Sequence, residues 1–98
     1  MVEVVWRKGA YNHLEKQCNH IKKDSPKSAE KVKNTILDIA ESLKNSPKIY
    51  PLDKYRKNNK GNIRAFEKYS LRVAYQVTEK QIRIIRVRHT SREPLKYY

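Results

Sequence analysis

The spacing of hydrophobic residues along the chain predicts a strand followed by a helix. Residues 2–6 alternate imperfectly, with Val2, Val4 and Trp6 on one face, and this pattern predicts a short strand. From residue 8 to about residue 23, apolar side chains recur every three or four positions, which is typical of an amphipathic helix. These side chains are Tyr11, Leu14, Cys18 and Ile21.

A second helix is predicted from residue 26 to about residue 45. Ser25 is a good N-cap residue, and Pro26 suits the first helical position because the N–H that it lacks has no partner there. Pro47 ends the helix. Its core face consists of Ala29, Val32, Ile36, Ile39, Ala40 and Leu43. The turn between the two helices is short, so they should form an antiparallel hairpin.

Three short strands are predicted after a long connection at residues 47–61. They span residues 62–68, 71–77 and 81–89, and the short turns between them predict an antiparallel meander. The last strand is apolar on both faces at first, as expected of a central strand. Loops as long as the 47–61 connection are usually functional or mobile.

The element order is therefore β-α-α-β-β-β in one domain spanning residues 1–98. We expect an α+β fold in which the helical hairpin packs on one face of a small, mainly antiparallel four-stranded sheet. The other face should stay open and carry Arg72, Gln76 and Arg64. An open sheet face lined with arginines is typical of a binding surface.

Charge strengthens this prediction of a binding face. The 98 residues include 23 Lys and Arg against 10 Asp and Glu, so the net charge is +13. Residues 1–53 carry 10 basic and 7 acidic groups, whereas residues 54–98 carry 13 and 3. Basic groups interleaved with tyrosines suit RNA, because phosphates need cations and unpaired bases need stacking surfaces.

The composition also argues against several classes of protein. A single cysteine excludes an internal disulfide framework and a cysteine-based zinc cluster, and two glycines exclude a glycine-rich phosphate loop. His13 and His20 lack acidic or cysteine partners at ligand spacing, so no metal and no cofactor is expected. The chain shows neither a signal peptide nor a membrane helix, which predicts a soluble, cytoplasmic protein without a membrane partner.

Two strands carry a resemblance to a known family. Leu71-Arg-Val-Ala-Tyr-Gln-Val77 is similar to a Tyr-Arg-Leu-Val-Tyr-Gln-Val strand, and Ile84-Ile-Arg-Val-Arg-His89 to a closing Ile-Leu-Arg-Val-x-His strand, of the RelE/ParE superfamily. Its members are toxins of bacterial type II toxin–antitoxin modules, also known from plasmid stabilisation. Size, element order and basicity agree over essentially the whole chain.

The resemblance implies one of two activities. RelE-like toxins are ribosome-dependent mRNA endonucleases (mRNA interferases), which cleave without metal by using the 2′-hydroxyl of the RNA. ParE-like toxins inhibit DNA gyrase and have no known nuclease chemistry. The first activity is the main prediction, because several candidate catalytic residues match RelE-like positions, and the second is the alternative.

These candidate catalytic residues are assigned by the resemblance. Arg72 would contact the scissile phosphate and Arg92 would stabilise it, while Tyr98 would stack on a base, or Tyr97 in its place. His89 would act as acid or base, because an imidazole suits either task at neutral pH. A structural histidine at a strand end is the alternative.

The general base is less clearly assigned. RelE-like toxins carry a lysine pair on the strand before Arg72, and this region reads Ile63-Arg-Ala-Phe-Glu67 in the present chain. An arginine stays protonated and cannot serve as a base, so Glu67, His89 or a loop lysine is required. The predicted RNA-binding residues are Arg64, Gln76, Arg86, Arg88, Lys96, Tyr97, Lys54, Lys57 and Lys60.

The resemblance also implies partners. A small antitoxin with an acidic toxin-binding segment would cover the basic face, using an amphipathic helix or an added strand. The target would be the ribosome with its mRNA or, in the alternative, DNA gyrase. Operator DNA would be bound only through the antitoxin.

Overall fold

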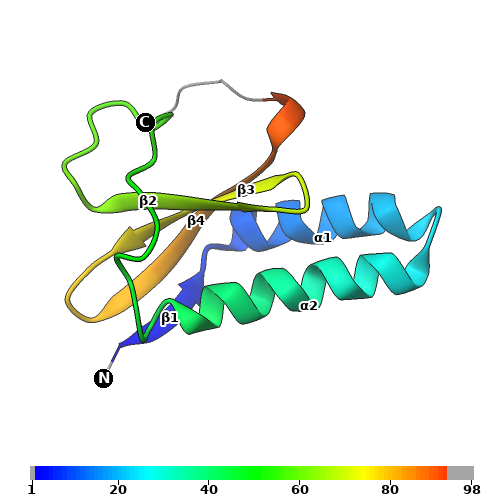
Figure 1. Cartoon of the computed structure of the whole chain (residues 1–98), viewed down its shortest axis with the longest axis horizontal. Coiled ribbons are helices and arrows are strands. Elements are labelled where there is room, and N and C mark those ends of the chain that lie inside the picture. The colour runs from blue at the N-terminus through cyan, green and yellow to red at the C-terminus, as the bar shows by residue number, and fades with distance from the viewer. Residues whose placement is uncertain (1, 93–98) are drawn as a thin grey trace.

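The computed structural model describes residues 2–92 and contains two helices packed on one face of a sheet (Figure 1). In chain order its elements are β1 (Glu3–Trp6), α1 (Lys8–Lys22), α2 (Pro26–Ser42), β2 (Ile63–Lys68), β3 (Leu71–Val77), β4 (Gln81–His89) and the 3₁₀ helix η1 (Thr90–Arg92). The predicted α+β fold and its β-α-α-β-β-β order are confirmed.

The four strands lie in the order β1-β4-β3-β2. β1 runs parallel to β4, and the other pairs are antiparallel. β4 is thus a central strand, as its apolar residues predict. The β3–β4 register shifts once, because Tyr75 lies opposite Ile84 whereas Ala74 lies opposite Arg86. Ile85 is therefore the extra residue of a β-bulge.

Local signals explain the limits of α2. The Ser25 side chain accepts a hydrogen bond from the backbone N–H of Ser28 at 3.2 Å, and Pro26 occupies the first turn. The helix ends at Ser42, a few residues before the predicted end, because residues 43–46 continue in tighter turns with N–H groups bonded three residues back.

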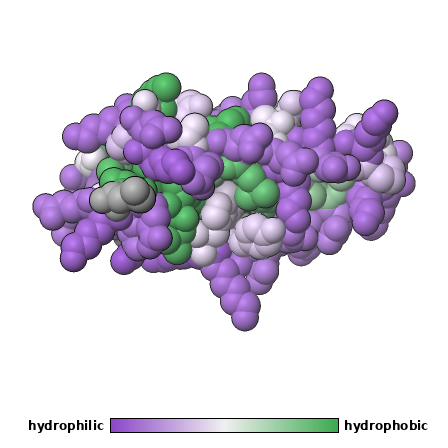
Figure 2. Space-filling model, turned by 90° about the horizontal axis from the view of Figure 1, so that it is seen from below, coloured by the Kyte–Doolittle hydropathy of each residue, from purple (hydrophilic) through white to green (hydrophobic). Residues whose placement is uncertain are grey.

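The main core lies between the helices and the sheet. Leu14 of α1 and Ile36 of α2 are fully buried against Val73 and Tyr75 of β3. Seen from the helical side, the surface is mostly hydrophilic, and its apolar patches are separated (Figure 2). Within residues 2–92, neither helix combines the length and apolarity needed to cross a membrane.

The connection at residues 47–61 covers part of the sheet that was expected to be open. Its first half follows the free edge of β2, where Asp53 N–H donates to the Ile63 carbonyl and Ala65 N–H to the Pro51 carbonyl. The loop then rises on the side of the sheet away from the helices (Figure 1). A small apolar cluster of Ile63, Ala65, Ala74 and Ile85 lies on this second face.

The start of the loop is anchored to the core by a hydrogen bond. Tyr75 is fully buried, and its hydroxyl donates to the Pro47 carbonyl at 2.8 Å. Burial raises the pKa of Tyr75, so the hydroxyl keeps its proton in the folded protein. The folded state therefore gains stability from this group below the pKa of an exposed tyrosine, and loses it as the pH rises beyond that value.

We predict that Tyr75→Phe lowers the free energy of unfolding by about 1 kcal/mol, because the half-buried Pro47 loses the donor to its carbonyl. Urea unfolding followed by circular dichroism measures the change. Tyr69→Phe is the matched control, since Tyr69 is exposed and should lose almost nothing. Equal losses in both variants would contradict the anchoring role.

Candidate functional site

Arg72 lies at the centre of a closed ionic network on the second face. Its Nη2 and Nε lie 2.9 and 3.3 Å from Asp53 Oδ1, and its Nη1 lies 2.5 Å from Glu67 Oε2. The Tyr55 ring covers the guanidinium, with 4.8 Å between Cζ and the ring centroid. Only 11% of the Arg72 side chain and 1% of the Asp53 side chain are exposed. The guanidinium is therefore held by protein carboxylates.

Two opposing effects act on the charge of Arg72. Burial disfavours the charged form, but the hydrogen bonds that Arg72 donates to Asp53 and Glu67 favour it more strongly and raise the pKa of Arg72 above its ordinary value. The guanidinium thus stays a cation, and the two carboxylates compensate it.

Strand register and a loop turn build this network. Glu67 and Arg72 lie directly opposite on β2 and β3, so their side chains share a face. Asp53 is held by its own turn, in which Oδ1 accepts from Tyr55 N–H and the backbone carbonyl from Asn59 Nδ2. The sequence reasoning missed Asp53. The sequence signal that could have identified it is that Asp53 is the one acidic residue in positions 47–61, a segment with five basic residues.

The other basic residues of the second face lie along β4. Arg86 and Arg88 lie opposite Ala74 and Arg72 of β3, and Arg83 lies opposite Gln76. Arg83 is exposed, whereas Gln76, Arg86 and Arg88 are half-buried. The Nε of Arg88 is buried without a hydrogen-bond partner among the described residues. The 47–61 loop adds three exposed lysines, which are Lys54, Lys57 and Lys60.

Arg64 does not belong to this face, which corrects the expectation. It lies opposite Tyr75, whose side chain packs in the core on the helical side. Arg64 Nη1 donates to the Tyr50 carbonyl at 2.7 Å. Strand pairing makes directly opposite residues share a face, so Arg64 and Arg72 lie on opposite sides of the sheet.

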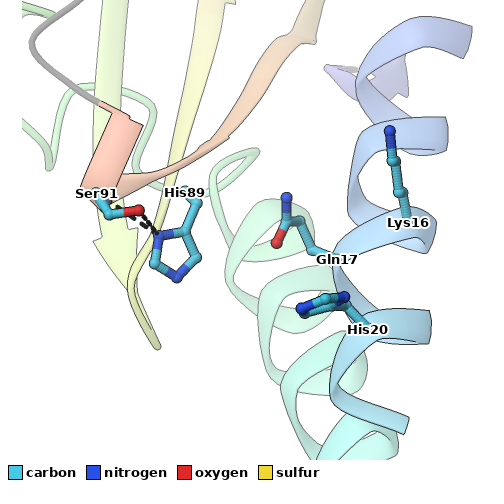
Figure 3. Close-up of a pocket in the computed structure, with 5 residues that line it drawn as sticks. All are labelled: Lys16, Gln17, His20, His89 and Ser91. Atoms are coloured by element: carbon cyan, nitrogen blue, oxygen red, sulfur yellow. Dashed lines mark hydrogen bonds between the residues drawn. The ribbon is translucent and has the colours of Figure 1, made fainter. Parts of the chain in front are cut away.

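His89 also lies on the helical side. It pairs with Leu71, a core residue, and lines a hollow beside α1 (Figure 3). The bulge at Ile85 causes this placement, because an extra residue reverses which face each later position of β4 occupies. The imidazole Nδ1 lies 2.8 Å from Ser91 Oγ and accepts from Ser91 N–H. The candidate base His89 and the candidate phosphate ligand Arg72 are therefore separated by the sheet.

The remaining candidates lie at the C-terminal end. Arg92 is the last residue of η1. Lys96, Tyr97 and Tyr98 lie outside the described residues. Among residues 2–92, no cluster of three or more His, Cys, Asp or Glu side chains could hold a metal ion.

Two of three comparisons relate this chain to known proteins. A family model described as the ParE toxin of the type II toxin–antitoxin system parDE matches residues 4–94. A search of curated proteins found no match.

Solved structures share the fold. One titled "Chromosomal ParDE TA system from P. aeruginosa" has a TM-score of 0.70 and 20% identity, covering 91% of this chain and 96% of that one. Another, "The structure of YoeB dimer from Staphylococcus aureus", has a TM-score of 0.51 and 16% identity, covering 99% and 97%. At these identities the likeness concerns the fold alone.

We predict that Asp53→Asn lowers the free energy of unfolding by about 3 kcal/mol, because it leaves a buried guanidinium without its main counter-charge. Glu67→Gln should cost about 1 kcal/mol or less, since half of the Glu67 side chain is exposed. Guanidinium chloride unfolding measures both. Comparable losses, or a milder loss for Asp53→Asn, would show that Asp53 is not the main partner of Arg72.

Proposed function

Because this chain belongs to the ParE toxin family of type II toxin–antitoxin systems, we propose that it acts by binding DNA gyrase and does not cleave RNA. Gyrase is the target that the superfamily resemblance assigns to ParE-like members. The observation that carries the proposal is the enclosure of Arg72 between Asp53 and Glu67.

An RNA phosphate would have to compete with these carboxylates for Arg72. The scissile phosphate is an anion, and it would approach a guanidinium beside the buried Asp53 carboxylate and beneath the Tyr55 ring. Displacing Asp53 would separate its buried negative charge from the Arg72 guanidinium, and breaking a buried ion pair costs several kcal/mol. The RelE-like role of the strand arginine is therefore unfavourable in this chain.

Two of the three kinds of candidate base for RNA cleavage are also poorly placed beside Arg72. A general base must come within hydrogen-bond reach of the 2′-hydroxyl. Glu67 is paired with Arg72 itself, and His89 lies across the sheet. The lysine pair of RelE-like toxins is absent from residues 63–67, so only the exposed loop lysines Lys54, Lys57 and Lys60 remain as candidate bases. A binding mode needs none of these groups, only a surface that complements its target.

The exposed cations supply such a surface. Arg83 on β4 and the loop lysines Lys54, Lys57 and Lys60 are all accessible to solvent. A net charge of +13 favours rapid encounter with an acidic partner. The same argument applies to a cognate antitoxin, which we propose to be a small cytoplasmic protein with an acidic toxin-binding segment. Operator DNA would be bound through this antitoxin.

We predict that the purified protein inhibits DNA supercoiling by gyrase and produces no cuts in a translated message. A supercoiling assay on relaxed plasmid measures the first activity, and primer extension on an actively translated mRNA measures the second. Glu67→Gln should inhibit gyrase as well as the unchanged protein does, because a binding mode does not need its carboxylate as a base.

Two results would contradict the proposal. One is full gyrase activity in the presence of a molar excess of folded toxin. The other is cleavage of the message in codon register, lost in Glu67→Gln. The second result would restore the ribosome-dependent endonuclease.

A further inference from the structure

A hollow of about 380 Å³ lies between α1 and the end of β4 (Figure 3). It exists because β1 ends at Trp6, opposite Ile84, so no described strand pairs with the outer edge of β4 beyond that point. Lys16, Gln17 and His20 line it from α1, His89 lines it from the end of β4, and Ser91 from η1. A smaller hollow of about 90 Å³ adjoins it and shares Lys16, Gln17 and His89.

The lining consists of polar side chains rich in hydrogen-bond donors. Lys16 supplies an ammonium group, Gln17 an amide, and His20 and His89 supply imidazoles. Neither hollow is lined by Asp, Glu or Cys among the described residues. His89 faces Gln17 and His20 across the hollow, so a small ligand between them can be contacted from both walls, whereas Lys16 is directed along α1 (Figure 3).

The hydrogen bonds of His89 define which nitrogen carries its proton. A backbone N–H can only donate, and Ser91 N–H is directed at Nδ1 at 3.2 Å. Nδ1 is therefore the acceptor, and in the neutral ring the proton resides on Nε2. Nε2 lies on the side of the ring away from Ser91, next to the hollow (Figure 3). His89 thus presents an N–H donor to a ligand.

The position of this proton favours an anion over a transition metal as the ligand. A transition metal would need the lone pair of Nε2, and the proton would then move to Nδ1, where Ser91 Oγ could accept it but the hydrogen bond from Ser91 N–H would be lost. An anion with several acceptor oxygens makes no such demand. It would accept hydrogen bonds from Nε2 of His89 and the Gln17 amide, and the exposed Lys16 side chain would reach it by rotating toward the hollow.

From this geometry we infer that the hollow is a binding site for a phosphate monoester. A terminal phosphate has three acceptor oxygens and a charge of about −1.5 to −2 at neutral pH, which suits a lining without acidic groups. The hollow is also large enough to admit part of an attached sugar. The site lies on the opposite side of the sheet from the Arg72 network and does not depend on how the toxin acts on gyrase.

The test is an NMR titration of the full-length protein with 5′-AMP, following the imidazole resonances of His20 and His89. Both should shift saturably with 5′-AMP and remain unchanged with adenosine. Lys16→Ala and His89→Ala should each weaken binding about tenfold, because each removes a hydrogen bond to a charged group.

Lys31→Ala is the matched control for general electrostatics. Lys31 is an exposed lysine on α2 that lines neither hollow, so its removal lowers the net charge equally and should leave the affinity for 5′-AMP unchanged. Lys16 is exposed as well, so its substitution should not impair folding, which the urea midpoint verifies. Equal weakening in Lys16→Ala and Lys31→Ala would overturn the site, as would equal shifts with adenosine.

Two further titrations distinguish the sources of the phosphate. A short single-stranded oligonucleotide is compared with and without its 5′-phosphate. Tighter binding of the phosphorylated strand than of 5′-AMP identifies a strand end as the ligand, and the reverse order identifies a free nucleotide. Identical binding with and without the 5′-phosphate would contradict the proposal, because the internal phosphates would then account for it.

Discussion

The ion pair between Arg72 and Asp53 determines what the second face of the sheet can do. It joins the start of β3 to the 47–61 loop, and both charges are almost completely removed from solvent. A buried charge is tolerated only where its partner is close and well oriented. The loop conformation and the availability of Arg72 are therefore coupled, so that Arg72 becomes available to an outside anion only if Asp53 leaves it.

The sheet also separates the candidate site residues from one another. Arg72 and Glu67 lie on the second face, whereas Arg64 and His89 lie on the helical face. The bulge at Ile85 matters most for this separation, since without it the strict alternation of β4 would place His89 on the same face as Arg72. One inserted residue thus removes the candidate base from the arginine and places it beside α1, where it can serve a different ligand.

The sequence predicted the elements well because their signals are local and periodic. The helical stripe around Leu14 and Cys18, the cap at Ser25 and Pro26, and the alternation of β3 all appear directly in the spacing of residues. The open face was not predicted correctly, because covering it depends on the contact between Asp53 and Arg72, 19 positions apart. The bulge was missed for a similar reason, as Ile84 and Ile85 fit a regular central strand equally well. Arg64 was placed on the wrong face because the register of β2 follows from its pairing with β3.

The most direct test of the central claim is an NMR measurement on the Nε–H group of Arg72, assigned by its loss in Arg72→Lys. The proton should exchange slowly with solvent, because Nε donates to Asp53 under the Tyr55 ring. It should also keep its chemical shift when a non-cleavable RNA strand, methylated at the 2′-oxygen, is added. Rapid exchange together with a large RNA-dependent shift would contradict the claim, because Arg72 would then be free of Asp53 and able to bind phosphate.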